Sequence, residues 1–297
     1  MKQPIEPTKE DCCNSGCNPC VFDVYEQQLK LYKKYLETGE LSGDKSENAI
    51  SQLEYTNFIL VKKVNLCEAH ILLLFKRLED KENNSKVWWS PGTHFLVKYI
   101  SEETPCTRAY TPLKHSDQSN TNCDFSVIIK VYENGLVSKY LNDLRLGDYT
   151  LWRGPYGSYE VVPNKYNRII MIAQGTGIAP FISIIENIIN NDDDMTKITL
   201  YYCTKSIDTI LLRDELYLFQ EYWNFSYKIF ISNLGENSKH KYKEPIVNHK
   251  LKQEDLCSLK PFSSNDQFLL CGTSQFMMDM KQWLTNEDNS LQNIILF

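Results

Sequence analysis

Residues 169–180 read Ile-Ile-Met-Ile-Ala-Gln-Gly-Thr-Gly-Ile-Ala-Pro. The apolar first part has the length of a buried strand, and Pro180 stands where the first turn of a helix tolerates proline. Between them, Gly175-Thr176-Gly177 would let the backbone approach a pyrophosphate, which the free N–H groups and the dipole of a helix start favour. A tight turn that merely needs glycine is the alternative, and for one short motif it is the commoner case.

The segment after Pro163 alternates between strand-like and helix-like patterns. Such alternation predicts a doubly wound α/β domain over residues 164–297, with its ligand at the carboxyl ends of the parallel strands. Cys271-Gly272 comes at such an end, although a free cysteine is often only a small buried apolar residue. The expected strands are 169–172, 198–203, 227–232 and 268–271, and the expected helices are 181–189, 213–222 and 276–284.

Residues 55–163 contain short β-rich runs with turn residues between them and a single helical stretch. This pattern predicts a small antiparallel β-barrel, so the chain is expected to have two domains, a β-barrel followed by the α/β domain. The expected strands are 58–64, 69–76, 94–99, 125–132, 149–153 and 159–162, and the expected helix is 136–144.

Composition excludes several classes of protein. A chain of 297 residues exceeds what one hydrophobic core usually serves, and its net charge of −6 argues against a nucleic-acid binder. No run reaches the ~18–20 apolar residues of a membrane span, and the first residues have no apolar core of a signal peptide. Ten cysteines without a secretory signal suggest a reducing compartment. We therefore expect a soluble, cytoplasmic protein.

A second motif, Arg108-Ala109-Tyr110-Thr111-Pro112, lies in the barrel region. On a strand, Arg108 and Tyr110 share one face, where the guanidinium can bind a phosphate and the phenol ring can lie against a flat ring system. Thr111 adds a hydroxyl that can hydrogen-bond a ring nitrogen. An ordinary surface strand is the alternative for this motif taken alone.

Several motifs in order are more informative than any one of them. The chain resembles the ferredoxin-reductase-like flavoproteins, most closely the NADH–cytochrome b5 reductase family, from Phe58 to Phe297. The motifs that carry the resemblance are RAYTP (108–112), VIIKVY (127–132), SKYL (138–141), RGPYG (153–157), GTGIAP (175–180), ILLR (210–213) and CG (271–272) followed by Met277.

The resemblance implies that the barrel binds FAD and that the α/β domain binds NADH, with NADPH as an alternative. Arg108 would bind the FAD pyrophosphate, Tyr110 would pack on the flavin and Thr111 would bond near its N5. Cys271 would orient the nicotinamide, so Thr111 and Cys271 are the expected catalytic residues. The other expected cofactor-binding residues are Ile129, Lys130, Tyr132, Gly135, Val137 and Ser138 for FAD, and Gly175, Thr176, Gly177, Thr209 and Gly272 for the nucleotide.

Some positions depart from the family pattern. Gln174 replaces a glycine, Leu136 replaces a lysine, and residues 271–277 read CGTSQFM where the family has CGPPPM. Thr209 stands where the family usually has an acidic residue that disfavours the extra phosphate of NADPH. Its neighbour Asp208 is the candidate substitute, and a preference for NADH alone is in doubt.

The first 35 residues lie outside the reductase resemblance. They contain Cys12, Cys13, Cys17 and Cys20, followed by an expected amphipathic helix, and residues 36–54 are expected to be a linker. The cysteines resemble the short "oxidoreductase-like" domain attached to some b5-reductase-like proteins. Four thiols could bind zinc, but adjacent Cys12 and Cys13 would crowd one ion, so a thiol-rich tail is an equal alternative.

The resemblance implies transfer of electrons from NADH to cytochrome b5 or a similar haem protein, with peripheral association if that acceptor is membrane-bound. A quinone, a ferric chelate or another flavoprotein are alternative acceptors. A catalytically weak adaptor that presents the cysteine segment to a partner is a third interpretation.

Overall fold

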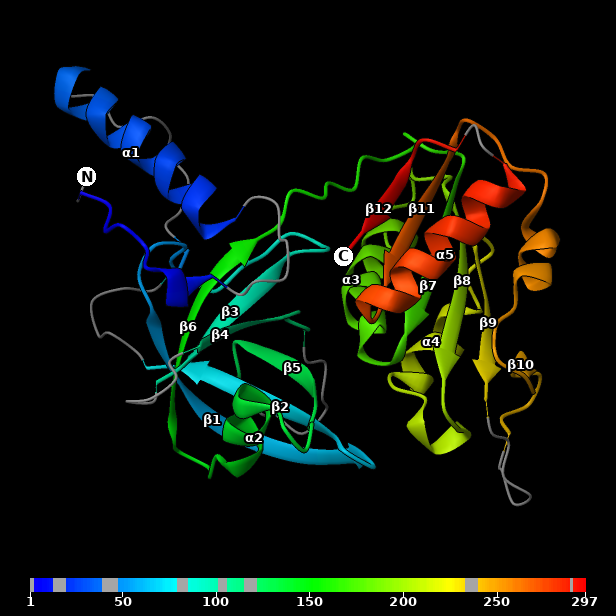
Figure 1. Ribbon diagram of the computed structural model, residues 1–297, viewed down its shortest axis with the longest axis horizontal. Coiled ribbons are helices and arrows are strands. Elements are labelled where there is room, and N and C mark those ends of the chain that lie inside the picture. The colour runs from blue at the N-terminus through cyan, green and yellow to red at the C-terminus, as the bar shows by residue number, and fades with distance from the viewer. Residues whose placement is uncertain are drawn as a thin grey trace. The chain divides into compact units, whose positions relative to one another are not determined.

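A computed structural model describes residues 3–12, 20–38, 48–78, 85–100, 106–114, 122–232, 240–288 and 291–297. The chain forms two compact units, Met1–Glu160 and Val161–Phe297. The first contains the antiparallel strands and the second contains the parallel sheet with its helices (Figure 1). Each unit is described by itself.

The N-terminal unit is built on six antiparallel strands in the order β4-β3-β6-β1-β2-β5. The two edge strands come together where Leu113, which follows β4, pairs with Ser126 of β5 through N···O distances of 2.8 and 3.0 Å. The predicted antiparallel FAD-domain fold is therefore confirmed. The strands are β1 (Thr56–Cys67), β2 (His70–Arg77), β3 (His94–Tyr99), β4 (Cys106–Tyr110), β5 (Phe125–Lys130) and β6 (Tyr149–Tyr156).

Aromatic rings fill the interior of this sheet. The ring of Phe125 has four aromatic neighbours with centroids 5.0–5.4 Å away, most of them edge-on, the arrangement that aromatic quadrupoles prefer. These neighbours are Phe58, Phe75, Phe95 and Trp152. Helix α2 (Leu136–Asp143) adds Val137 and Leu141 to the same core and contacts β3 and β4. Its first turn is thereby held in place by the core.

One expected strand of the barrel is wrong. Residues 159–162 form no strand, and β6 instead runs on to Tyr156, three residues beyond its expected end. Gly157 comes next with a φ of +119°, a backbone conformation that ends the extended strand and that glycine tolerates best. Val162 is 47% exposed, so the apolar residue that suggested a buried strand here is not buried.

The N-terminal segment belongs to the same compact unit as the barrel. It contains a short 3-10 helix, η1 (Lys9–Asp11), and the helix α1 (Val21–Thr38), so the expected amphipathic helix is confirmed and extends three residues into the expected linker. The linker also contains Ile50, which is 2% exposed and lies in the core of the barrel. The segment that its polar composition predicted to be a linker is therefore packed on the barrel through Ile50.

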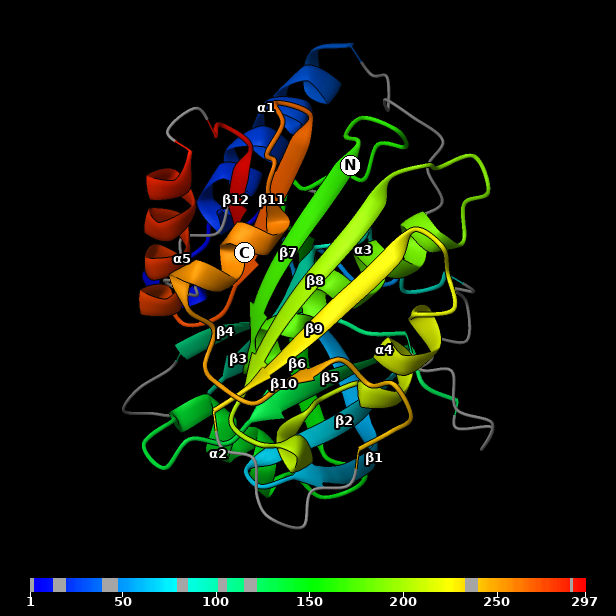
Figure 2. The ribbon, with the colours of Figure 1, turned by 90° about the vertical axis from the view of Figure 1, so that its right-hand side faces the viewer.

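The C-terminal unit has a six-stranded parallel sheet in the order β10-β9-β8-β7-β11-β12. Figure 2 shows these strands side by side, with α5 beside the sheet. Met280 and Leu284 of α5 pack on Ile170 of β7 and Leu270 of β11 in one core. The predicted α/β fold is confirmed. Its elements are β7 (Arg168–Gln174), α3 (Ala179–Ile189), β8 (Lys197–Thr204), α4 (Arg213–Phe219), β9 (Phe225–Ile231), β10 (Ile246–Val247), β11 (Asp266–Cys271), α5 (Ser274–Glu287) and β12 (Ile294–Leu296), with short 3-10 helices η2 (Gly175–Ile178), η3 (Ile207–Thr209) and η4 (Gln253–Leu259).

Within the part of the chain that the structure describes, we find no helix with the length and hydrophobicity that crossing a bilayer requires.

Candidate functional site

Strand β4 carries the expected flavin residues on one of its faces. Arg108 is exposed, and its Nη1 donates to the carbonyl oxygen of Thr107 at 2.8 Å. Tyr110 packs on Trp152, with ring centroids 6.2 Å apart, and burial raises the pKa of its phenol. The phenol therefore stays neutral at physiological pH. Thr111 follows the strand and is partly exposed.

The loop before α2 is closed by Ser138 and requires a glycine. The hydroxyl of Ser138 accepts from the backbone N–H of Tyr132 at 3.1 Å and donates to the carbonyl oxygen of Gly135 at 3.2 Å. A Cβ at Gly135 would lie 2.3 Å from Ser138 Oγ. Val137 is 3% exposed and belongs to the core. These side chains shape the loop, so a phosphate at this loop would have to be bound by the backbone N–H groups at the start of α2.

The expected flavin-binding residues in and just after β5 differ in their exposure to solvent. The side chain of Ile129 is fully buried in the barrel core, so it can face a ligand only through its backbone. Lys130 is exposed, and its Nζ lies 5.3 Å from the ring centroid of Tyr132, which is 53% exposed. The latter two form a cation–aromatic pair open to a ligand or partner.

In the C-terminal unit, the two glycines of the GTG turn have different roles. Gly175 has a φ of +54° and no atom within 4 Å of its missing Cβ, so its backbone is open to an approaching group. A Cβ at Gly177 would lie 2.5 Å from the carbonyl oxygen of Cys271. The turn thus packs backbone to backbone against the end of β11, and it brings Gly175, Thr176 and Gly177 together with Cys271 and Gly272.

Burial raises the pKa of the Cys271 thiol to about 12. It is therefore a neutral thiol at physiological pH, suited to packing and weak hydrogen bonding and not to nucleophilic attack. Next to it, a Cβ at Gly272 would come within 2.7 Å of Phe276 Cδ1 and 2.9 Å of Gln174 Cβ. A side chain at this position would require Phe276 or Gln174 to shift.

Gln174 and Thr273, two departures from the family pattern, are in contact. Gln174 Oε1 accepts from the backbone N–H of Thr273 at 3.4 Å and from its hydroxyl at 3.1 Å. The Thr273 Oγ1 also caps α5 by accepting from the Phe276 N–H at 3.3 Å. Sequence reasoning found each position but missed the pair, because no pattern links residues so far apart.

Thr209 lies in a turn just beyond the end of β8. It is 9% exposed, and its Oγ1 bonds the backbone N–H and carbonyl oxygen of Ser206 at 3.0 and 2.9 Å. Its side chain is thus occupied within the turn, whereas the neighbouring carboxylate of Asp208 is exposed. Asp208 is accordingly the group of the two that is free to meet a ribose.

Two of the four N-terminal cysteines lie together. The Sγ atoms of Cys12 and Cys20 are 3.8 Å apart. Cys13 and Cys17 lie outside the described residues. Among the residues that are described, no group of three or more His, Cys, Asp or Glu side chains could hold a metal ion.

The candidate residues of each unit, taken by themselves, fit the cofactor that the sequence implies for that unit. The exposed guanidinium of Arg108 beside an aromatic ring suits a diphosphate joined to a flat ring system. The open backbone at Gly175, ahead of η2 and α3, suits a dinucleotide phosphate.

Three family matches agree with this division. Residues 57–161 match the family described as "Oxidoreductase FAD-binding domain" and residues 171–282 match "Oxidoreductase NAD-binding domain". Residues 1–40 match "Oxidoreductase-like protein, N-terminal". The chain is thus an oxidoreductase with FAD- and NAD-binding domains.

Relatives similar over nearly the whole chain define the family. The Homo sapiens protein "NADH-cytochrome b5 reductase-like" is 31% identical over 95% of this chain and 90% of its own length. The Mus musculus protein of that name is also 31% identical, over 99% and 95%. The chain therefore belongs to the NADH-cytochrome b5 reductase-like family of NAD(P)H-dependent FAD oxidoreductases.

Solved structures support the fold. The cytochrome b5 reductase domain of Ulva prolifera nitrate reductase matches with a TM-score of 0.69 at 21% identity, over 84% of this chain and all of that one. The CS-b5R domains of human Ncb5or match with a TM-score of 0.66 at 19% identity, over 82% and 69%.

Proposed function

We propose that this reductase takes a hydride from NADH and passes electrons singly to cytochrome b5 or a similar haem protein. The observation that carries the proposal is the similarity, over 95% of the chain, to a relative named for this reaction. Bound FAD would accept the hydride from the reduced nicotinamide and release its electrons one at a time. The chain's own residues would bind and orient the two cofactors.

On the flavin side, Arg108 would pair with the pyrophosphate, Tyr110 would pack on the ring system, and Thr111 would donate near the flavin N5. The open face of β4 supports these roles, since Arg108 is exposed and the Tyr110 phenol is neutral. The remaining contacts would come from the backbone of Ile129, the side chains of Lys130 and Tyr132, and the loop of Gly135, Val137 and Ser138.

On the nucleotide side, the Gly175-Thr176-Gly177 turn would bind the phosphates through backbone N–H groups. Cys271, a neutral thiol, would orient the nicotinamide, and Gly272 would keep the loop close to the turn. Asp208 would favour NADH, because its exposed carboxylate repels the extra phosphate of NADPH. Thr209 would contribute by shaping the turn that holds Asp208.

Exposed lysines of the barrel unit suit an acidic acceptor. Lys114, Lys130 and Lys139 are exposed, whereas Lys98 is committed to Asp11 at 3.3 Å. Charged contacts of this kind set the rate of encounter more than the affinity. These lysines would equally serve an acceptor that is bound to a membrane.

The test is reduction of the haem domain of cytochrome b5 by NADH, compared with reduction of ferricyanide by the same enzyme. Lys114→Glu combined with Lys139→Glu should slow the haem reaction on the order of tenfold, because opposite charges no longer meet. The ferricyanide rate should change little. No haem reduction by the wild-type enzyme, with ferricyanide or a quinone still reduced, would exclude this acceptor.

A further inference from the structure

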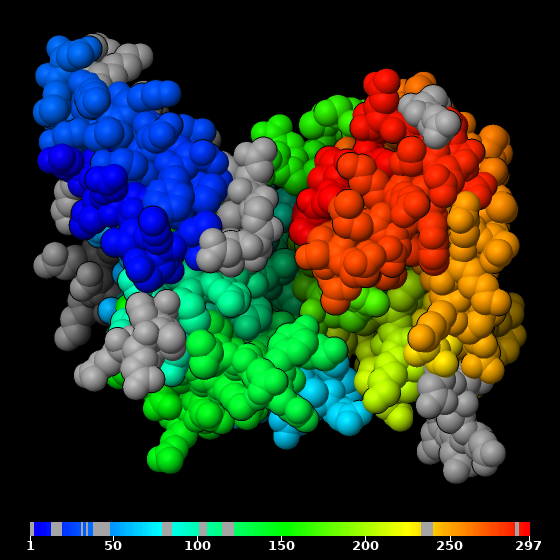
Figure 3. Space-filling model, in the orientation of Figure 1, coloured from blue at the N-terminus to red at the C-terminus, as the bar shows by residue number. Residues whose placement is uncertain are grey.

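The N-terminal segment, residues 8–12 and 20–24, packs on the outer face of the flavin-binding sheet. In Figure 3 its blue atoms adjoin the blue-green atoms of the barrel. The start of α1 buries two valines there, next to residues of β3 and β6, which removes their apolar surface from water. The cluster consists of Val21, Val24, Leu96 and Tyr156, with Ala109 of β4 packed against it.

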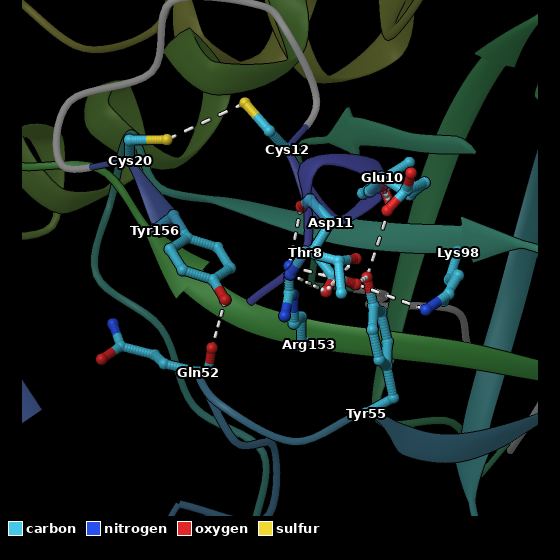
Figure 4. A network of polar contacts seen from close by, with 11 residues as sticks. Thr8, Glu10, Asp11, Cys12, Cys20, Gln52, Tyr55, Lys98, Arg153 and Tyr156 are labelled. Atoms are coloured by element: carbon cyan, nitrogen blue, oxygen red, sulfur yellow. Dashed lines mark hydrogen bonds and ion pairs between the residues drawn. The ribbon is translucent and has the colours of Figure 1, made fainter. Parts of the chain in front are cut away.

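Asp11 is the centre of the polar part of this contact (Figure 4). The residue is 8% exposed. Its Oδ2 accepts from the backbone N–H of Thr8 at 2.8 Å, and its Oδ1 accepts from the Tyr55 hydroxyl at 3.2 Å. The Nζ of Lys98 lies 3.3 Å from the same Oδ1. One carboxylate therefore joins the N-terminal segment to β3 and to the residue just before β1.

A buried arginine depends on the same residue. Arg153 of β6 has a side chain only 3% exposed, and its Nη2 donates to the carbonyl oxygen of Asp11 at 2.7 Å and lies 3.8 Å from Oδ1. Its guanidinium carbon lies 4.6 Å from the ring centroid of Tyr55. A buried guanidinium without a counter-charge is strongly unfavourable, so removal of the Asp11 carboxylate should loosen this face of the sheet.

The contact reaches the flavin strand through Thr107. Its hydroxyl donates to the carbonyl oxygen of Glu10 at 2.8 Å, and the residue is fully buried. Because side chains alternate along a strand, Thr107 and Ala109 face the N-terminal segment while Arg108 and Tyr110 face the other way. Among the described strands β4 pairs along its length with β3 alone, so the contacts of its other side chains contribute to fixing its position.

We propose that Asp11 is a positioning residue for the flavin: it fastens the N-terminal segment to the back of β4 and so holds Arg108 and Tyr110 in place for FAD. The inference rests on the proposed placement of FAD on that strand. It gives the "oxidoreductase-like" segment a part in cofactor binding that does not depend on its cysteines.

The test compares full-length variants by the dissociation constant of FAD, measured from flavin fluorescence on reconstitution of the apoprotein. Asp11→Ala should raise this constant on the order of tenfold, because a buried ion pair loses one partner. Asp11→Asn, which keeps the shape and one acceptor, should give a smaller rise. Glu10→Ala is the matched control, since its exposed side chain is removed while the carbonyl oxygen that Thr107 uses remains, and its FAD affinity should not change.

Two more measurements separate positioning from general instability. In Asp11→Ala, hydrogen exchange should accelerate in the peptide that contains Ala109 and Tyr110, while the affinity of the C-terminal unit for NAD⁺ should stay the same. Should Asp11→Ala fail to fold, Thr107→Val removes a single hydroxyl and should raise the FAD dissociation constant about threefold.

The variant Arg108→Ala distinguishes failure of the role of Asp11 from failure of the proposed placement of FAD. Weak FAD binding by Arg108→Ala together with wild-type binding by the folded Asp11 and Thr107 variants would overturn the role of Asp11 and leave the placement of FAD intact. Wild-type binding by all of these variants, Arg108→Ala included, would overturn the placement of FAD itself.

Discussion

The amide oxygen of Gln174 accepts two hydrogen bonds from Thr273, one from the backbone N–H at 3.4 Å and one from the hydroxyl at 3.1 Å. The two residues end neighbouring parallel strands or follow them directly, so the contact ties the GTG turn to the CGTS loop. Both residues depart from the usual family pattern. The two departures are therefore in direct contact with each other.

This pair makes the first prediction. Thr273→Val removes the hydroxyl that donates to Gln174 and caps α5, and it should lower the free energy of unfolding by about 1 kcal/mol. It should also raise the KM for NADH, with FAD content unchanged, because the cap belongs to the nucleotide unit. Thr285→Val, on the same helix, is the control and should leave the KM unchanged. Equal effects of the two substitutions in denaturation and steady-state assays would contradict the assigned role of Thr273.

The two glycines of the GTG turn make the second prediction. Gly177→Ala should abolish detectable reduction of the flavin by NADH, because the new Cβ would lie 2.5 Å from the backbone of Cys271. Gly175→Ala has room around it and bears only the cost of a left-handed conformation, roughly 1–2 kcal/mol. Stopped-flow absorbance at the flavin band should therefore rank wild type, Gly175→Ala and Gly177→Ala in that order. The reverse order would mean that room at the backbone does not limit nucleotide binding.

Much of the fold could be predicted from the sequence, because it rests on local patterns. The alternation of strands and helices after Pro163 and the short β runs before it indicated both domains. The expected strand at residues 159–162 failed for a physical reason: Gly157 turns the chain away from β6, and Val162 beyond it is exposed. The two valines at 161–162 show by themselves no sign of whether a neighbouring strand exists for them to pair with.

The candidate site residues could be proposed from the sequence, but the residues that contact them could not. Strand alternation placed Arg108 and Tyr110 on one face, and the glycines marked the close approach of backbones. The contact of Gln174 with Thr273 joins residues 99 positions apart, and that of Asp11 with Arg153 joins residues 142 apart. Such contacts arise from tertiary packing, which periodicity and short motifs do not encode.

Nucleotide preference makes the third prediction. Asp208→Asn should lower the ratio of kcat/KM for NADH over NADPH on the order of tenfold, about 1.4 kcal/mol, because a like-charge repulsion is removed. Asp192→Asn, an exposed carboxylate in the turn before β8, controls for net charge and should leave the ratio unchanged. Equal ratios for Asp208→Asn and wild type would mean that Asp208 is not the residue that discriminates between NADH and NADPH.

The protonation of Asp11 makes the fourth prediction. Burial would raise the pKa of Asp11, but hydrogen bonds from Thr8 and the charges of Arg153 and Lys98 outweigh it and lower the pKa overall. A carboxyl with a lowered folded-state pKa adds stability above its ordinary value of about 3.9 and loses it as the pH falls through the folded value. The difference in unfolding free energy between wild type and Asp11→Asn should thus be constant near pH 7 and shrink below about pH 4. Urea denaturation across this range measures it, and a constant difference down to pH 2 would mean that the carboxylate is not stabilised by the fold.

The cysteines of the N-terminal segment make the last prediction. The 3.8 Å between Cys12 Sγ and Cys20 Sγ equals the separation of two thiolates around a tetrahedral zinc ion, about 3.8 Å for Zn–S bonds of about 2.3 Å. Both residues stand at anchored points, since Cys12 follows η1 and the N–H of Cys20 donates to Asp23 at 2.7 Å ahead of α1. We expect the purified protein to contain about one zinc ion per chain, and Cys12→Ser and Cys20→Ser each to lose it.

Cys257→Ser, an exposed cysteine of the C-terminal unit, should retain the metal. Substitution of the zinc by cobalt should give thiolate-to-metal absorption whose intensity counts the sulfur ligands. Because Val21, Val24 and Asp11 also hold the segment on the barrel, loss of the metal should leave FAD binding intact. A metal-free protein that forms a disulfide between Cys12 and Cys20 on mild oxidation would instead make the pair a dithiol.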